Sequence, residues 1–363
     1  MGRRLRHRDR RRDPAGWARE LGVAKEVVDL YLASDVIDLH NCSTIWWRLG
    51  YDLARRHRPL LGRGTPLLGQ IDLPRAREAL TGAVWDITTN PFRTARGRLE
   101  VFRRNLSRLR RLIARYPDDL ELVVTGDDYR RARAAGRLAC WVAVQGGNAF
   151  DADLGLLDRL PDGAVSRVTL VHLTRSRAGT PSTDWLGRAG GLTAHGRALV
   201  AKLVERRIFV DLSHVNRAGF RDALEVVPSG VPVLVTHTGV QAVRPARRNL
   251  DDEQLIAVAR TGGVVGVIYQ AAFIGRNPLD YGIRDVADHM EHVVRVVGDE
   301  HLALGSDFDG TVIVPRDLPD VTYQPRLVAE LLSRGWSPER IRRVLGGNYL
   351  RVLEQLRPGR GEG

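Results

Sequence analysis

Eight short apolar runs, seven of which end on a polar residue or a tyrosine, limit most strongly how this chain can fold. They cover residues 36–40, 83–87, 140–145, 168–172, 208–214, 232–237, 264–269 and 302–307. Several are near-continuous runs of Val, Ile and Leu, which is typical of parallel strands buried on both faces. Segments with helical periodicity separate them, for example 194–206, 250–260 and 286–297. No GxGxxG motif follows the first run, so the alternation predicts a closed (β/α)8 TIM barrel rather than an open doubly wound sheet.

The length of 363 residues suits one such barrel, and no composition change marks a second domain. We expect a disordered Arg-rich tail over residues 1–14, one barrel domain over 15–357 and a flexible C-terminus over 358–363. Residues 48–70 are rich in Arg, Gly and Pro and predict a long loop after the first strand. A last helical pattern over 337–356 predicts a terminal helix.

The net charge of +13 raises the question of nucleic-acid binding. Only Lys25 and Lys202 are lysine among the 56 basic residues, so the excess of arginine indicates genome composition rather than a selected phosphate-binding surface. No zinc finger, RNA-recognition motif or basic stripe with interleaved aromatics is present, and nucleic-acid binding is not expected. We also expect no membrane segment and no secretory signal. With two cysteines, Cys42 and Cys140, a disulfide scaffold is excluded, and we expect a reducing, cytoplasmic setting.

The polar residues at the ends of the apolar runs predict a functional site. Functional side chains of a (β/α)8 barrel gather at the carboxyl ends of its strands. Here those ends carry His40, Gln145, His172, His214, His237 and Asp307. Imidazole nitrogens and carboxylate oxygens are the usual zinc ligands, and a thiolate such as that of Cys42 in His40-Asn41-Cys42 can join them. The set therefore predicts a metal or catalytic site at the mouth of the barrel.

Nine sequence segments, in order and with consistent spacing, resemble the renal (membrane) dipeptidase family of the amidohydrolase superfamily. They are DLHNC (38–42), QIDLPRAREALTGAVWDI (70–87), VQGGNAFD (144–151), VTLVHLT (168–174), VDLSHVN (210–216), PVLVTHTGV (232–240), RRNLDDEQL (247–255), GSDFDG (305–310) and LGGNYLRVL (345–353). The resemblance runs from about residue 35 to residue 356. It implies a zinc-dependent barrel that hydrolyses dipeptides, with a homodimer as a further expectation.

The resemblance also implies roles for individual residues. His40, residue 42 and Asp307 would bind a first metal, His214 and His237 a second, and residue 145 would bridge the two. His172 would polarise the scissile carbonyl and stabilise the oxyanion. Arg248 would hold the terminal carboxylate of the substrate, a role that suits a planar guanidinium. Asp307 would also transfer the proton to the leaving amine.

Three positions depart from the family pattern. Cys42 stands where the family has Asp, Gln145 where it has a bridging Glu, and Thr88 where a substrate-contacting Tyr is expected. A neutral amide is a poor bridge between two dications, whose repulsion then lacks part of its compensation. We therefore expect one firmly held zinc, with two ions or none as the alternatives.

Two locations for that metal remain open. One is His40, Cys42 and Asp307, and the other is His214 and His237 with help from Gln145 or Asp307. Cys42 and Gln145 also have plain structural interpretations, as a small buried residue and a hydrogen-bonded core amide. Asp38 shares a strand face with His40 and is a further candidate ligand, although a supporting role is equally consistent.

Three functions follow as hypotheses. The first is a dipeptidase-like, metal-dependent hydrolase of a dipeptide or a small carboxylate-bearing amide. The second is a non-hydrolytic or silenced homologue recruited to the biosynthesis or binding of a peptide-like metabolite. The third is a regulatory binding protein that uses residues 1–13 as an interaction arm.

Overall fold

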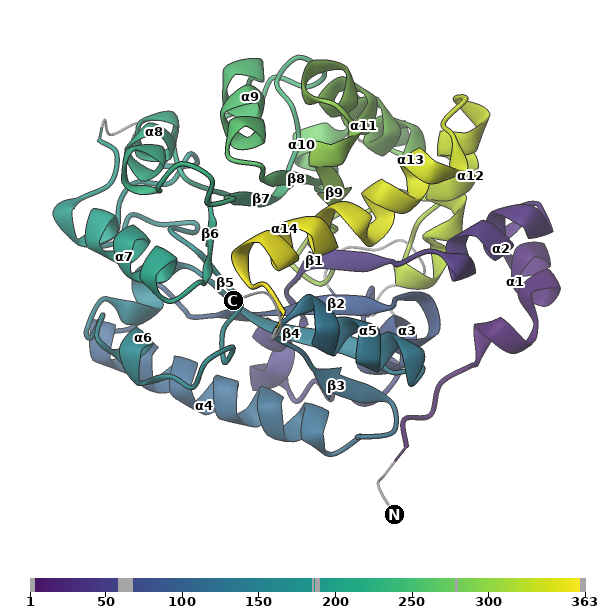
Figure 1. Cartoon of the computed structure of the whole chain (residues 1–363), viewed down its shortest axis with the longest axis horizontal. Coiled ribbons are helices and arrows are strands. Elements are labelled where there is room, and N and C mark those ends of the chain that lie inside the picture. The colour runs from purple at the N-terminus through teal and green to yellow at the C-terminus, as the bar shows by residue number, and fades with distance from the viewer. Residues whose placement is uncertain (1–3, 58–67, 185, 187–189, 278–279, 360–363) are drawn as a thin grey trace.

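The computed structural model describes residues 4–57, 68–184, 186, 190–277 and 280–359. The first three residues, part of the expected loop at 48–70 and the last four residues of the expected C-terminal tail lie outside this part. Figure 1 shows a ring of helices around a central sheet. The strands are β1 (Ile37–Asn41), β2 (Gly82–Thr88), β3 (Leu120–Leu122), β4 (Leu138–Gln145), β5 (Arg167–Thr169), β6 (Phe209–Asp211), β7 (Leu234–Thr238), β8 (Val264–Val267) and β9 (Leu302–Leu304).

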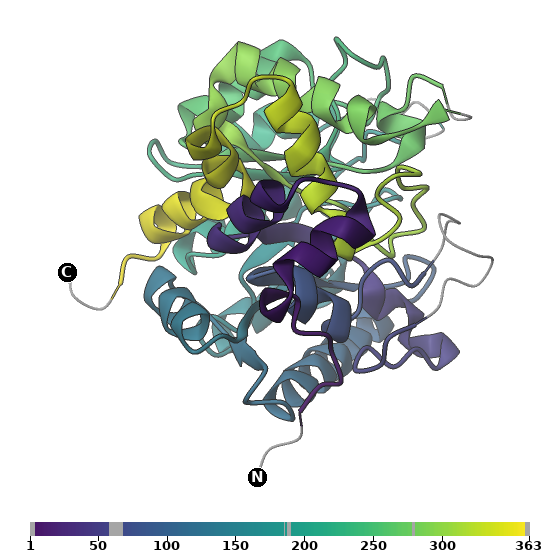
Figure 2. The ribbon, with the colours of Figure 1, turned by 90° about the vertical axis from the view of Figure 1, so that its right-hand side faces the viewer.

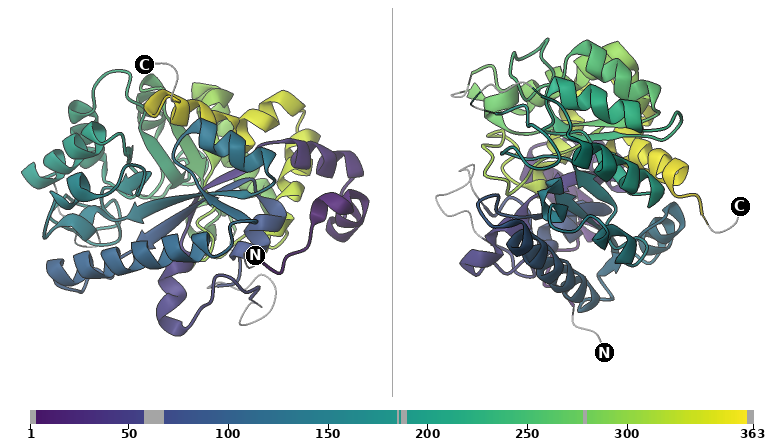
Figure 3. Two further views of the ribbon diagram at one scale, coloured as in Figure 1. Left: turned by 60° about the horizontal axis from the view of Figure 1, so that its bottom comes forward. Right: turned by 90° about the vertical axis from the view of Figure 1, so that its left-hand side faces the viewer.

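The helices are mostly the crossover connections between these strands. They are α1 (Pro14–Leu21), α2 (Lys25–Ala33), α3 (Leu73–Ala79), α4 (Ala95–Ala114), α5 (Gly126–Ala134), α6 (Leu156–Arg159), α7 (Ala194–Glu205), α8 (Arg217–Val226), α9 (Asp252–Arg260), α10 (Ala271–Ile274), α11 (Ile283–Val297), α12 (Pro325–Ser333), α13 (Pro338–Arg342) and α14 (Asn348–Leu356). Figure 3 shows the longest helix, α4, along the outside of the sheet. No helix in the described part of the chain is long and apolar enough to cross a membrane.

All strand pairings are parallel, and the sheet closes on itself. The order around the ring is β1, β2, β4, β5, β6, β7, β8 and β9, and β9 pairs with β1. This confirms the predicted (β/α)8 barrel. The ninth strand, β3, was not predicted; it pairs only with the first residues of β4 and lies outside the ring. Its three residues are too few to show a periodicity in the sequence.

Alternation along the strands sends one set of apolar side chains into the barrel. Trp141 on β4 packs against Tyr129 of α5 and against Tyr349 of α14, with ring centroids 5.9 and 5.4 Å apart. Val352 and Leu353 of α14 join the same buried cluster, together with residues near the starts of several strands. Helix α14 therefore closes the amino-terminal end of the barrel, which leaves the carboxyl end for the site. The predicted terminal helix is confirmed as one continuous helical stretch through α13 and α14.

Residues 4–13 pack on the barrel, which differs from the disordered tail that we expected over 1–14. Leu5 is 6% exposed, and its amide donates to the Asp119 carboxylate at 2.7 Å. The buried guanidinium of Arg10 lies 3.5 Å from the Glu78 carboxylate and over the Trp17 ring. The sequence could not show that acidic groups distant in the chain meet these arginines. Figure 2 shows this N-terminal segment leading into α1 and α2, which lie beside α12.

Candidate functional site

A cavity of about 660 Å³ opens at the carboxyl ends of the barrel strands. Six of the eight predicted site residues line it, namely Cys42, Gln145, His172, His214, Arg248 and Asp307. The other two, His40 and His237, lie beneath these residues and stack on each other with ring centroids 3.7 Å apart. The structure thus brings all eight predicted residues into one site.

Three of these residues lie beyond their strands rather than at the strand ends. We predicted strands to His172, His214 and Asp307, but β5 ends at Thr169, β6 at Asp211 and β9 at Leu304. His214 and Asp307 have φ values of 67° and 60°, in the left-handed region that side chains other than glycine rarely adopt. Such a backbone cannot continue a strand, and local strain of this kind gathers at functional sites. It turns both side chains into the cavity.

His40, Cys42 and Asp307 form the one group of three His, Cys, Asp or Glu side chains in the described part of the chain whose geometry suits a metal. Their ligand atoms all lie within 4.8 Å of one another. His40 Nε2 is 3.3 Å from Cys42 Sγ and 3.4 Å from Asp307 Oδ1. Imidazole, thiolate and carboxylate are the donors that zinc prefers, so this set fits a zinc ion on both chemistry and spacing.

The protonation of this group depends strongly on its surroundings. Burial disfavours the His40 cation, but the Asp86 carboxylate and the neighbouring Cys42 and Asp307 outweigh burial, so the pKa of His40 lies well above its usual value. Burial raises the pKa of the Cys42 thiol to about 12. The thiol therefore keeps its proton, which it donates to Gln145 Oε1 over 3.1 Å. A metal ion would have to displace protons from both side chains.

Gln145 lies between the two candidate metal positions and is held by hydrogen bonds. Its Oε1 accepts from Cys42 Sγ and from Thr88 Oγ1, the latter at 2.9 Å. Its Nε2 lies 3.1 Å from His40 Nε2 and 3.4 Å from His214 Nε2. An amide nitrogen carries two hydrogens and offers no lone pair to a cation. Thr88, at the position of the expected tyrosine, thus orients Gln145.

His214 and His237 form a second, neutral pair. Their Nε2 atoms are 2.8 Å apart, so one nitrogen donates to the other. Burial, Arg248 and the neighbouring histidines hold the pKa of each well below its usual value. The Thr236 hydroxyl donates to Asp211 and accepts from His237 Nδ1 at 2.9 Å, which leaves the His237 Nε2 lone pair free. The donor is then His214 Nε2, and this favours a hydrogen bond over metal binding at the pair.

His172 and Arg248, which we predicted to bind the substrate, both line the cavity. His172 packs edge-on against His214, with ring centroids 4.7 Å apart. Burial, followed by the charges of His40 and Arg248, lowers the pKa of His172 to about 3, so the ring is neutral. Arg248 is 3% exposed, and its Nη2 donates to the carbonyl oxygen of His237 at 2.6 Å. Burial lowers its pKa to about 10, and its Nε has no hydrogen-bond partner in the described structure.

A network of buried charges supports the site from below, and sequence reasoning missed it. Arg167 on β5 donates from Nη2 to both Asp86 carboxylate oxygens at 2.6 and 2.7 Å, and from Nη1 to Asp211 at 2.7 Å. Asp86 also accepts from His40 Nδ1 at 3.0 Å. Arg167, a charged residue within a buried strand, is the sequence feature that indicates this network, but it cannot be distinguished by type in a chain with 54 arginines. The carboxylate fixes the ring of His40 with Nε2 toward Cys42 and Asp307.

Asp38, the further candidate ligand, has a supporting position instead. Its carboxylate accepts from the amide of Ser306 at 3.0 Å, from the Ser306 hydroxyl, and from the amide of His40 at 3.3 Å. These bonds tie β1 to the loop that carries Asp307. Burial raises the pKa of Asp38 to about 6.

Comparison with known proteins agrees with this geometry. The model of the family described as membrane dipeptidase (peptidase family M19) matches residues 24–359. Dipeptidase 3 of Mus musculus is 31% identical over 300 residues, which are 79% of this chain and 58% of that protein. Dipeptidase 3 of Homo sapiens is 31% identical over 299 residues, 81% of this chain and 60% of that protein. The chain thus spans about three fifths of the length of these relatives.

Solved structures give the same result at lower identity. A metallopeptidase from Rhodobacter sphaeroides, liganded with a phosphinate mimic of the dipeptide L-Ala-D-Ala, superposes with a TM-score of 0.77 at 26% identity and covers 89% of this chain and 99% of its own. A structure described as dipeptidase AC, a metallopeptidase of family M19, has a TM-score of 0.76 at 27% identity, over 89% of this chain and 98% of its own. Together with the (β/α)8 barrel and its cluster of histidines, these matches show that the chain belongs to the membrane dipeptidase family, peptidase family M19.

Proposed function

We propose that the protein hydrolyses the amide bond of a dipeptide or a similar small amide with a free carboxylate, using one zinc ion held by His40, Cys42 and Asp307. The observation that carries this proposal is the close approach of these three ligand atoms at the floor of a cavity that also holds Arg248 and His172. The dipeptide mimic bound to the Rhodobacter sphaeroides relative supports the substrate class.

Arg248 fits the role of substrate anchor. A buried guanidinium without an acidic partner in hydrogen-bond range has a strong preference for an anion. Its unpartnered Nε offers a donor to the substrate carboxylate while Nη2 stays bound to the His237 carbonyl. Binding of the carboxylate by Arg248 thereby fixes the position of the scissile carbonyl within the cavity.

Asp307 and His172 then act on the reacting atoms. A zinc ion held by His40, Cys42 and Asp307 would supply Lewis acidity toward the carbonyl oxygen and the attacking water. Asp307 accepts the proton from the attacking water as the carbon–oxygen bond forms, and returns it to the amine nitrogen as the carbon–nitrogen bond breaks. Neutral His172 donates a hydrogen bond to the carbonyl oxygen as negative charge develops on it.

The single-metal part of the proposal rests on Gln145 and on the pair below it. Gln145 directs an amide nitrogen, rather than a carboxylate, between the two candidate positions. His214 and His237 satisfy each other by a hydrogen bond. We also propose a cytoplasmic setting, which is supported by Cys42 and Cys140 as free, buried thiols. The homodimer stays a prediction.

A zinc titration with a dipeptide assay tests this function. Metal-depleted protein receives increasing zinc, and release of alanine from L-Ala-D-Ala and L-Ala-L-Ala is followed at each step. We expect activity to rise to one equivalent of zinc and then level off, and to be lost in Asp307→Asn. Activity that needs two equivalents would refute the single metal. A folded, zinc-loaded protein without turnover on any dipeptide would refute hydrolysis and favour the alternative of a homologue recruited to another reaction on a peptide-like metabolite.

A further inference from the structure

Four arginines stand at the mouth of the cavity and have no part in the chemistry above. These rim arginines are Arg48, Arg93, Arg104 and Arg108, and all four line the cavity. Arg48 lies in the 3-10 helix Ser43–Leu49 that follows β1. The other three follow β2, with Arg93 just before α4 and Arg104 and Arg108 one turn apart on it. Among the described lining residues, Asp307 is the one carboxylate, so the cavity is strongly cationic.

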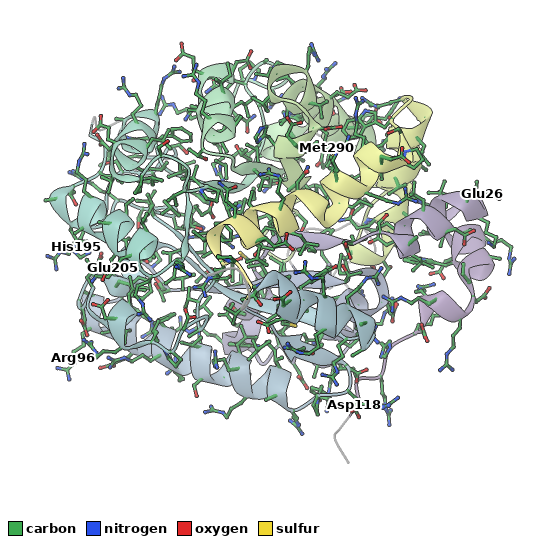
Figure 4. All side chains as sticks on the ribbon, in the orientation of Figure 1. Glu26, Arg96, Asp118, His195, Glu205 and Met290 are labelled. Atoms are coloured by element: carbon green, nitrogen blue, oxygen red, sulfur yellow. The ribbon has the colours of Figure 1, made fainter. Side chains whose placement is uncertain are left out.

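The rim arginines differ from other arginines of the same region in lacking acidic partners. Arg96 of α4 pairs with Glu100 at 3.4 Å, and Arg98 pairs with Asp151 at 2.6 Å. In the described structure no carboxylate lies within ion-pair distance of any rim arginine. Arg108 instead lies over the Trp47 ring, 4.4 Å from its centroid, which keeps the guanidinium at the cavity mouth. Figure 4 shows the side chains along α4, with Arg96 near its start.

The order of strands places the rim arginines across the cavity from Arg248. Arg248 follows β7, and β2 is four strands away from β7 around a ring of eight. The catalytic residue Asp307 follows β9, between the two sides of the ring. A substrate whose carboxylate is bound by Arg248 and whose amide lies over Asp307 thus directs its other end toward the rim arginines. In a dipeptide this other end is the amino-terminal residue.

We propose that the preferred substrate carries a second anionic group, a carboxylate or a phosphate, on the amino-terminal side of the scissile amide, where the rim arginines bind it. This inference rests on the proposed function and narrows its substrate class. A neutral or basic amino-terminal residue places its ammonium group alone against four cations, which is unfavourable at the mouth of a partly desolvated cavity. An anionic group there gains several charge-assisted hydrogen bonds. Thr88 offers no hydrogen-bond donor to an anionic group, because its hydroxyl already donates to Gln145 Oε1.

Matched pairs of dipeptides test the second anion. Asp-Ala is compared with the isosteric Asn-Ala, phosphoseryl-Ala with Ser-Ala, and Lys-Ala serves as the cationic case; both Kd by calorimetry and kcat/KM are measured on zinc-loaded protein. We expect at least one anionic member to be favoured by about tenfold over its neutral partner, as several partly exposed ion pairs together provide. The advantage is expected to shrink as salt is raised. The aspartate and phosphoserine arms distinguish a carboxylate substrate from a phosphate substrate.

A double substitution on α4 links the preference to the rim arginines. Arg104→Gln with Arg108→Gln is expected to abolish most of the tenfold difference, because Asp-Ala and phosphoseryl-Ala lose ion pairs while Asn-Ala and Ser-Ala lose the repulsion of their ammonium groups. Arg103→Gln with Arg111→Gln removes the same charge from exposed positions of α4 outside the cavity lining and is expected to keep the difference.

The outcomes separate this inference from the function on which it rests. Equal Kd values for the anionic and neutral partners, or a preference that the Arg103 and Arg111 control removes equally, would overturn the inference. Hydrolysis at equal rates and with equal Kd values within both pairs, Asp-Ala with Asn-Ala and phosphoseryl-Ala with Ser-Ala, would leave the proposed function intact and refute the second anion. Preferential binding of the anionic compounds without hydrolysis of any would support the anion site and refute the proposed hydrolase.

Discussion

Asp86→Asn tests how the buried charge network prepares the metal site. Asp86 is fully buried, and its carboxylate receives two hydrogen bonds from Arg167 and one from His40 Nδ1. Asparagine has the same size, so the substitution removes the charge without opening a cavity. It deprives His40 of the anion that orients its ring and of the main attraction that raises its pKa.

The magnitudes follow from what remains after the substitution. Loss of one partner of a buried ion pair costs about 3–5 kcal/mol, and Arg167 keeps Asp211 at 2.7 Å, so we expect the lower end, about 3 kcal/mol of unfolding free energy. A carboxylate that supports a metal-binding histidine contributes about 10–100-fold in metal affinity, which equals about 1.4–2.7 kcal/mol. Zinc affinity should fall by this factor.

Zinc competition with a chromogenic chelator measures the affinity, and urea unfolding measures the stability. Asp211→Asn is the matched control, because it also removes one carboxylate from Arg167 but contacts Thr236 beside His237 rather than His40. We expect it to lower stability by a similar amount and to leave zinc affinity nearly unchanged. Unchanged affinity in Asp86→Asn with weakened affinity in Asp211→Asn would refute the reasoning and place the metal at His214 and His237.

Three further predictions concern protons and ligands. Burial raises the pKa of the Asp309 carboxyl to about 7, so the folded state keeps a proton that the unfolded chain loses near pH 4. The free energy of unfolding should therefore fall as pH rises from about 4 to 7, by about 1.4 kcal/mol per pH unit from this group. Asp309→Asn should flatten that slope in urea titrations, and an unchanged slope would contradict the assignment. Zinc binding at pH 7 should release about two protons, from His40 and Cys42, because both ligands must deprotonate. Calorimetry in buffers of different ionisation enthalpy counts the released protons, and no proton release would argue against these ligands. Cys42→Asp combined with Gln145→Glu introduces the two acidic ligands of the family pattern and should raise the zinc content from one ion per chain to two. Mass spectrometry of the metal measures this content, and a single zinc ion in the double variant would show that Gln145 does not limit the number of bound zinc ions.

The barrel and most of the site could be predicted because both depend on local pattern, whereas Arg248 was expected only from the family resemblance. Eight buried apolar runs correspond to β1, β2 and β4 to β9, and the polar residues that follow them meet at one end for purely topological reasons. The left-handed turns at His214 and Asp307 could not be predicted, because nothing in the local sequence marks a non-glycine residue with positive φ.

Contacts between segments that are distant in the chain could not be predicted from the sequence. The ion pair of Arg10 with Glu78 and that of Arg167 with Asp86 join residues 68 and 81 positions apart. In a chain with 54 arginines, composition hides which of them are buried and which lack a partner. The rim arginines became visible only when α4 was placed beside the cavity mouth.

The position of the metal tests the central claim most directly. Crystals of the zinc-loaded protein, measured on both sides of the zinc absorption edge, give an anomalous difference peak at each bound ion. We predict one peak, with ligand distances of about 2.0–2.3 Å to His40 Nε2, Cys42 Sγ and Asp307. A single peak between His214 and His237, or two peaks joined by Gln145, would contradict the account.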